Sequence, residues 1–145
     1  FKGDDVAFAL LFDMNRIFED YVAYEMKKQY PHLSIKTQHT SQHLLTMPKK
    51  QFSLRPDLMI SDHAIGDTKW KLVDSNKRNY GLSQSDLYQM FAYGKKYERE
   101  DLYLIYPKSE NFISSQDNPF EYEEGMPLQL LCFDCEEGRF VNFEL

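Results

Sequence analysis

The sequence predicts an α/β fold in which a mixed β-sheet carries a helix on either face. Two segments place apolar residues at helical spacing, and several shorter runs alternate or are continuously apolar, as strands are. Their order along the chain is one helix, three strands, a second helix, one strand and a hairpin. Strands on both sides of a helix in the sequence are typical of layered α/β domains. We expect 145 residues to form a single domain, residues 1–145.

The first helix is expected over residues 13–29. Its apolar face follows a three-four spacing and comprises Met14, Ile17, Phe18, Tyr21 and Val22. Asp13 is a suitable N-cap and Pro31 ends the helix. The residues before Asp13 either extend this helix or belong to a missing region. Because the chain has no initiating Met and opens inside a pattern, we expect a C-terminal fragment of a longer protein.

Three strands are expected between the two helices, over residues 33–45, 52–61 and 64–74. The first is rich in β-branched and polar residues, and the second alternates before it becomes apolar. Pro56 lies inside the second strand, which predicts a bulge or an edge position there. The short segment "SDH" between the second and third strands predicts a tight turn.

The second helix is expected over residues 82–97, with Ser83 as N-cap and Asp86 completing a capping box. Its core face is expected to comprise Leu87, Met90, Phe91 and Gly94. A buried strand follows at residues 101–107, ended by a proline. After a long polar loop, residues 128–134 and 139–145 predict a terminal hairpin.

The composition favours a folded protein outside the membrane. Hydrophobic residues make up 42% and aromatic residues 15%, which argues against disorder. No apolar run approaches the ~18 residues of a membrane span. Cys132 and Cys135 lie in an apolar run, so we expect buried free thiols and a cytoplasmic protein. Neither they nor the four histidines have the spacing of a zinc site.

The charge is distributed unevenly along the chain. The net charge is −6, but residues 49–99 carry ten Lys or Arg against six Asp or Glu. This basic middle is compatible with a phosphate-binding face, although basic runs are more often solvated surface. The candidates for contacts to DNA phosphates are Lys71, Lys77, Arg78, Lys95 and Lys96.

Three charged residues on the predicted strands form the strongest candidate site. Asp57 and Asp67 fall on neighbouring strands, and Lys69 follows Asp67 by two residues, so both point to one face. Two carboxylates suit Mg²⁺, which takes one or two of them together with water and substrate phosphate. Such an ion activates water for displacement at phosphorus, and a nearby lysine offsets the developing charge. Each residue also has a plain interpretation: Asp57 could pair with Arg55, and Asp67 with Lys69 at the surface.

These residues and their surroundings resemble a known nuclease family. Pro56-Asp57 followed by Asp67-Thr68-Lys69 resembles the PD-(D/E)xK nuclease superfamily. The segments "LFDMNRIFEDYVA", "LRPDLMI", "DTKWK" and "SDLYQMFAYGKKY", in that order, resemble the nuclease domain of McrC, the cutting subunit of the McrBC 5-methylcytosine restriction system. The resemblance runs from about residue 11 to residue 107. It implies a restriction-endonuclease-like core, a mixed sheet flanked by helices.

The resemblance also implies roles for individual residues. Asp57 and Asp67 would be metal ligands, the carbonyl of Thr68 a further ligand, and Lys69 would position the attacking water. Glu19, on the first helix, matches the helix acid that joins the metal site in this superfamily. Glu19 could instead be an exposed helix acid near Arg16.

A second helix motif of RecB-like nucleases, QxxxY, also has a match. Gln89 and Tyr93 have this spacing, which puts both on one helix face. Gln84 and Tyr88 have it as well, so the register is open, and we favour Gln89 and Tyr93 for their sequence context.

The resemblance therefore implies a Mg²⁺-dependent endodeoxyribonuclease, with Mn²⁺ as a substitute, that defends against foreign DNA. It would leave a 5′-phosphate and act when recruited by an AAA+ GTPase of the McrB type, through an N-terminal region absent here. Two alternatives remain open. One is a RecB-like DNA repair nuclease of the same fold, and the other is a non-catalytic scaffold or interaction domain.

Overall fold

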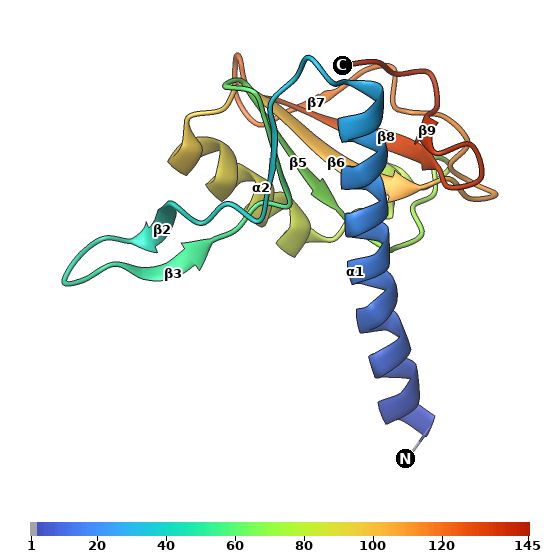
Figure 1. Cartoon of the computed structure of the whole chain (residues 1–145), viewed down its shortest axis with the longest axis horizontal. Coiled ribbons are helices and arrows are strands. Elements are labelled where there is room, and N and C mark those ends of the chain that lie inside the picture. Colours follow the sequence, from blue (N-terminus) through green and yellow to red (C-terminus); the bar gives the residue numbers. More distant parts are fainter. Residues whose placement is uncertain (1–2) are drawn as a thin grey trace.

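A mixed β-sheet forms the centre of the computed structural model, which describes residues 3–145 apart from the side chains of residues 8, 11 and 12 (Figure 1). The strand order is β1–β4–β5–β6–β8–β7, and β9 pairs with β8. The strands are β1 (Ile35–Thr37), β4 (Leu58–Ile60), β5 (Ala64–Thr68), β6 (Asp101–Pro107), β7 (Phe120–Glu121), β8 (Pro127–Asp134) and β9 (Arg139–Phe140). Strands β5, β6 and β8 are parallel, and the other pairings are antiparallel. The expected mixed sheet is confirmed.

One helix covers each face of this sheet, as the sequence predicts. Side chains alternate along β6: Leu104 packs in the cluster that contains Met90 of α2 (Gln84–Tyr97). Its neighbour Ile105 packs in the opposite cluster, with Val22 of α1 (Gly3–Gln29). Because successive side chains of a strand point to opposite faces, the two helices lie on opposite sides of the sheet.

Helix α1 is longer than its expected core portion. It begins at Gly3, so Asp13 lies inside the helix and is not its N-cap, and the preceding residues extend it. Its buried residues lie in the second half, where Phe18, Val22 and Met26 are at most 2% exposed. The first half projects beyond the sheet (Figure 1).

Each of the three strands predicted between the helices differs from its observed form. The segment 33–45 divides into β1 and β2 (Gln42–Leu45), because the backbone turns at Gln38 with φ 54°. The segment 52–61 divides into β3 (Gln51–Leu54) and β4, because Pro56 lacks the N–H that a continuous ladder needs. The third strand ends at Thr68, not at residue 74, where the Trp70 amide turns to the Asn15 side chain of α1. The predicted "SDH" turn joins β4 to β5 as an antiparallel pair.

The buried face of α2 is rotated from the expected one. Met90 and Gly94 are buried as predicted, but the face continues through Tyr93 and Tyr97, and Phe91 is 38% exposed. The terminal hairpin of β8 and β9 forms, with a shorter second strand than expected. A 3₁₀ turn (Arg78–Gly81) precedes α2.

The two cysteines are free, but they differ in exposure. Cys132 is buried on β8, whereas Cys135, which we expected to be buried, is exposed in the turn after it. None of the helices described over residues 3–145 combines the length and apolar character of a bilayer span.

Strands β2 and β3 form a separate two-stranded sheet that projects from the body (Figure 1). Its base is fastened to α2 by one buried tyrosine. The Tyr97 hydroxyl donates to the Leu54 carbonyl at 2.6 Å and accepts from the Gln42 amide at 3.3 Å. This hydroxyl therefore joins both strands of the β2–β3 hairpin to the helix.

We expect Tyr97→Phe to loosen the hairpin, because it leaves two backbone groups without this partner. A lost hydrogen bond of this kind costs ~1 kcal/mol, so amide exchange over residues 42–54 should accelerate about fivefold. Hydrogen exchange followed by mass spectrometry measures it. Tyr88→Phe, at a 65% exposed position of the same helix, is the matched control. Equal protection in both variants would contradict the anchoring role of Tyr97.

Candidate active site

A depression of about 310 Å³ lies where α1, the segment before β4, the end of β5 and α2 meet. It brings together all seven site residues predicted from the sequence. Its lining comprises Asn15, Glu19, Arg55, Asp57, Asp67, Thr68, Lys69, Lys71, Gln89 and Tyr93. These residues come from four separate segments of the chain, so the fold itself assembles the cluster.

The register of β5 directs Asp67 toward α2. Ile65 belongs to the cluster that packs on α2, and Asp67 follows it by two residues and therefore faces the same side. Asp67 is only 3% exposed. It stands near the carboxyl end of a strand that runs parallel to β6, which is where ligands bind in open α/β sheets.

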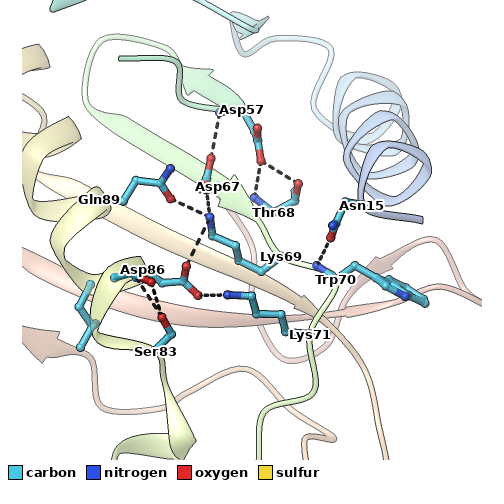
Figure 2. Close-up of polar contacts among 12 residues, drawn as sticks. Asn15, Asp57, Asp67, Thr68, Lys69, Trp70, Lys71, Ser83, Asp86 and Gln89 are labelled. Atoms are coloured by element: carbon cyan, nitrogen blue, oxygen red, sulfur yellow. Dashed lines mark hydrogen bonds and ion pairs between the residues drawn. The ribbon is translucent and has the colours of Figure 1, made fainter. Parts of the chain in front are cut away.

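The two carboxylates are interlocked through the backbone (Figure 2). Asp67 Oδ1 accepts from the Asp57 amide at 3.2 Å, and Asp57 Oδ2 accepts from the Thr68 amide and hydroxyl, both at 2.8 Å. Thr68 therefore holds Asp57 through its N–H and its side chain. Among the ion pairs of residues 3–145, none joins Asp57 to Arg55, the plain interpretation of that aspartate.

Lys69 is the centre of the polar contacts (Figure 2). Its Nζ lies 2.8 Å from Asp67 Oδ2, 2.7 Å from Gln89 Oε1 and 3.7 Å from Asp86 Oδ1. The Lys69 side chain is 15% exposed, so its bond with Asp67 is not the solvated surface pair of the plain interpretation. A pair that is removed from water is costly unless further hydrogen bonds satisfy both partners, and Gln89 supplies one of them.

The helix motif lies in the favoured register. Gln89 Nε2 donates to the Tyr93 hydroxyl at 3.0 Å, and that hydroxyl donates to the Arg55 carbonyl at 3.2 Å. Gln89 and Tyr93 therefore join Lys69 to the segment that carries Asp57. Gln84 and Tyr88, the other pair with this spacing, are exposed.

Asp86 is a member of the cluster that the sequence analysis assigned to the helix cap alone. The Ser83 hydroxyl accepts from the Asp86 amide, as half of a capping box does. The Asp86 carboxylate instead meets Lys71 at 2.8 Å and Lys69 at 3.7 Å, and the residue is 6% exposed. Its spacing of three from Gln89 could have indicated this position, because residues three and four apart share a helix face.

The helix acid of α1 faces the same depression. Glu19 lies four residues after Asn15, another lining residue that the sequence analysis did not single out. Its carboxylate accepts from the Gln38 side chain at 3.5 Å. Arg16, the alternative partner of Glu19, bonds to Asp20 at 3.2 Å.

Burial and like charge perturb the acids of the site. Burial, and then the neighbouring charge of Asp57, raises the pKa of Asp67 to about 8 despite the opposing effect of Lys69. Burial and Asp57 also raise the pKa of Glu19. Burial alone lowers the pKa of Lys69, but the carboxylates of Asp67, Asp86 and Asp57 outweigh it and raise that pKa. Lys69 is therefore an ammonium ion, and the site holds more negative charge than it can compensate.

The five candidate phosphate contacts are dispersed. Lys71 lines the depression and pairs with Asp86. Lys95 pairs with Glu123, and the remaining candidates Lys77, Arg78 and Lys96 line other surface. Only one of the five thus lies within the lining of the site.

The donor set fits a hard divalent cation. The carboxylates of Asp57, Asp67 and Glu19 offer oxygen atoms only, but within residues 3–145 no three His, Cys, Asp or Glu side chains form a group that could hold an ion. This excludes a closed structural zinc site in the described chain. It fits Mg²⁺, which completes its shell with water and substrate phosphate around one or two carboxylates.

Comparison with known proteins gives a family and a fold. The family model described as McrBC 5-methylcytosine restriction system component matches residues 1–107. No curated protein matches the chain. The resemblance to McrC predicted from the sequence is thereby confirmed.

Among solved structures, the chain is similar to one chain of an assembly of Thermococcus gammatolerans McrB AAA+ hexamers with bound McrC. The TM-score is 0.59 at 15% sequence identity, and the match covers 83% of this chain. It covers 28% of that chain, so the present sequence spans less than a third of the protein it matches. At this identity the similarity concerns the fold.

The raised pKa of Asp67 predicts how stability depends on pH without metal. Between ~4, the pKa of an unfolded Asp, and about 8, the folded protein holds a proton that the unfolded chain has released. The free energy of unfolding therefore falls as pH rises through this window, by up to ~1.4 kcal/mol per pH unit. We expect Asp67→Asn to flatten this slope in urea titrations with EDTA.

Asp62→Asn, on the exposed turn before β5, is the control for loss of one carboxylate. It should keep the wild-type slope. An equal slope in wild type and Asp67→Asn would show that Asp67 is already ionised at neutral pH.

Proposed function

The chain belongs to the McrBC family of 5-methylcytosine restriction system components, and on this premise we propose that it is a metal-dependent DNA endonuclease domain of the PD-(D/E)xK type. One observation carries the proposal: the seven residues predicted for such a site converge on one depression, with Asp67 and Lys69 buried together. The proposed cofactor is Mg²⁺, with Mn²⁺ as a substitute. The family match favours this function over the RecB-like repair nuclease.

Asp57 and Asp67 would hold the ion, with Glu19 facing it from α1. When bound, Mg²⁺ supplies Lewis-acid chemistry, because it stabilises charge on phosphate oxygens and makes water more acidic. The protein's part begins with the interlocking of the two aspartates through the Asp57 and Thr68 amides, which fixes where their oxygens point. The carbonyl of Thr68 is a further candidate ligand.

Lys69 acts on the reacting groups as a cation. Its raised pKa keeps it protonated at neutral pH, so it donates hydrogen bonds and does not accept the proton of water. In hydrolysis, a water oxygen bonds to phosphorus and the P–O3′ bond breaks, which leaves a 5′-phosphate and a 3′-hydroxyl. Lys69 orients the water and stabilises charge on the phosphate, while Gln89, held by Tyr93, aims the ammonium.

The proposed partner is an AAA+ GTPase of the McrB type. The solved assembly with the similar chain contains McrB AAA+ hexamers with bound McrC. We propose that the present chain is the McrC-type component of such a system and cuts DNA when recruited. Recognition of the modified base would then belong to the partner.

Metal binding tests the site directly. Because the ligands must be deprotonated, Mg²⁺ should displace the proton of Asp67, and each ion bound should release close to one proton at pH 7. Calorimetry in two buffers of different ionisation enthalpy measures this number. We expect Asp67→Asn to weaken Mg²⁺ binding at least tenfold and to abolish proton release.

Circular dichroism confirms that each variant is folded, and Asp62→Asn is again the control. Equal binding by Asp67→Asn and wild type would place the ion elsewhere. A folded wild type that binds neither Mg²⁺ nor Mn²⁺, even with a duplex oligonucleotide present, would favour the scaffold alternative.

Cleavage separates Lys69 from the metal ligands. In reactions reconstituted with a McrB-type GTPase and a duplex containing 5-methylcytosine, we expect Lys69→Met to reduce the cleavage rate at least 100-fold while Mg²⁺ still binds. Asp86→Asn should reduce it about tenfold, because Lys69 keeps its contacts with Asp67 and Gln89. Lys108→Met removes an exposed lysine elsewhere and should leave the rate unchanged. Cleavage by Lys69→Met at the wild-type rate would refute its role.

A further inference from the structure

The β2–β3 hairpin is the most exposed regular element after the first half of α1. Its outer residues 44–50 are all exposed, and it projects from the body (Figure 1). No predicted site residue lies on it, and the proposed chemistry does not use it. Its sequence and attachment nevertheless point to a ligand.

The charge of this region is opposite to that of the whole chain. Residues 31–56 contain no Asp or Glu and carry four Lys or Arg, whereas the chain has a net charge of −6. Two of these cations, Lys49 and Lys50, lie together at the outer end of the hairpin and are exposed. An acid-free arm on an acidic protein is complementary to a polyanion, and clustered lysines neutralise phosphates.

The hairpin also presents apolar side chains to solvent. Phe52 and Met47 are 67% and 79% exposed, and Leu44, opposite Phe52 in the ladder, is 47% exposed. Phe52 has a φ of 58°, a backbone conformation that is unfavourable for a bulky residue and that gathers at binding sites. Exposed apolar side chains beside lysines are the combination that proteins lay into DNA grooves.

The base of the hairpin is joined to the candidate active site. Tyr97 of α2 holds the Leu54 carbonyl, and Tyr93, one turn earlier, holds the carbonyl of Arg55. The chain then reaches Asp57 two residues later. Because these contacts fix the hairpin to the helix that carries Gln89, a duplex seated with a phosphate in the site would extend past the hairpin.

From these observations we propose that the β2–β3 hairpin is a duplex-DNA contact arm that grips the substrate beside the scissile phosphate. Lys49 and Lys50 bind backbone phosphates, and Phe52 and Met47 lie against the groove surface. A two-stranded ribbon is one of the elements that fit a DNA groove. The inference rests on the proposed DNA endonuclease function and adds the surface that holds the substrate.

A protein partner is the competing occupant, because exposed apolar residues also mark protein interfaces. The charge favours DNA: the region offers no carboxylate to pair with a partner's cations, and its lysines stand at the outermost position. The attachment to the Asp57 segment favours DNA as well, since the scissile strand must pass there.

The test is duplex binding without metal, so that cleavage does not intervene. Fluorescence anisotropy with a labelled 30-base-pair duplex in EDTA, from about 50 to 200 mM salt, gives the affinity and its salt slope. We expect Lys49→Gln/Lys50→Gln to weaken binding at least tenfold at low salt and to lower the slope by ~1.8, about 0.9 for each phosphate contact. Lys27→Gln/Lys28→Gln, an exposed pair at the end of α1, is the matched control and should bind as wild type does.

A second variant separates the apolar contact from the ionic one. Phe52→Ala should weaken binding threefold or more and leave the salt slope unchanged, because no counterion is released by that contact. Circular dichroism checks folding, and the substituted side chains are exposed.

Three results would overturn the inference. The first is equal weakening by the hairpin and the α1 lysine pairs, which would mean a diffuse charge effect. The second is wild-type DNA affinity in the hairpin variants with loss of co-elution with the McrB-type GTPase, which would assign the arm to a protein partner. The third is absence of duplex binding by wild type at 50 mM salt. The Mg²⁺ calorimetry stands apart from all three, so failure of the arm is distinguishable from failure of the metal site.

Discussion

The bond between the Asp67 carboxylate and the Lys69 ammonium joins the sheet to α2, and much of the candidate site depends on it. Both groups are largely removed from water, at 4% and 15% side-chain exposure. Charges in such a position destabilise a fold unless their remaining hydrogen-bonding capacity is satisfied. Gln89 meets the ammonium and the Asp57 amide meets the carboxylate, so the neighbouring positions on α2 and before β4 are constrained by this single pair.

The pair does not neutralise the site, and this imbalance is informative. Asp57 lies against Asp67, and Asp86 approaches Lys69 from α2, so the carboxylates outnumber the one buried ammonium. A protein selected only for stability gains nothing from a second carboxylate at this point, because each buried charge adds a desolvation cost. An excess of oxygen donors around one lysine is the arrangement expected where a divalent cation and a phosphate complete the charge balance. The raised pKa of Asp67 expresses the same imbalance through a proton.

Local sequence patterns predicted the element types well and their ends poorly. The sheet, the helix on each face and the convergence of Asp57, Asp67 and Lys69 followed from periodicity and spacing, because those patterns report which side of an element is buried. The ends depended on contacts that no local pattern contains. Pro56 divides a strand only because the flanking pieces join different sheets, and β5 ends where Asn15, far away in the sequence, takes the Trp70 amide. Asp86 was overlooked because its cap position already explained it. Its second role exists only once β5 brings two lysines to that face.

The segment Arg55–Pro56–Asp57 shows how one constraint serves two surfaces. The proline ends the β3 ladder, so the chain can leave the hairpin and enter the main sheet at β4. Tyr93 binds the carbonyl on one side of the proline, and Thr68 binds the carboxylate on the other. A displacement of the hairpin would therefore be transmitted to Asp57 through three consecutive residues with a restricted backbone. If the hairpin grips DNA, the geometry that holds the duplex and the geometry that places the first carboxylate are the same, and substrate contact and site assembly are mechanically coupled.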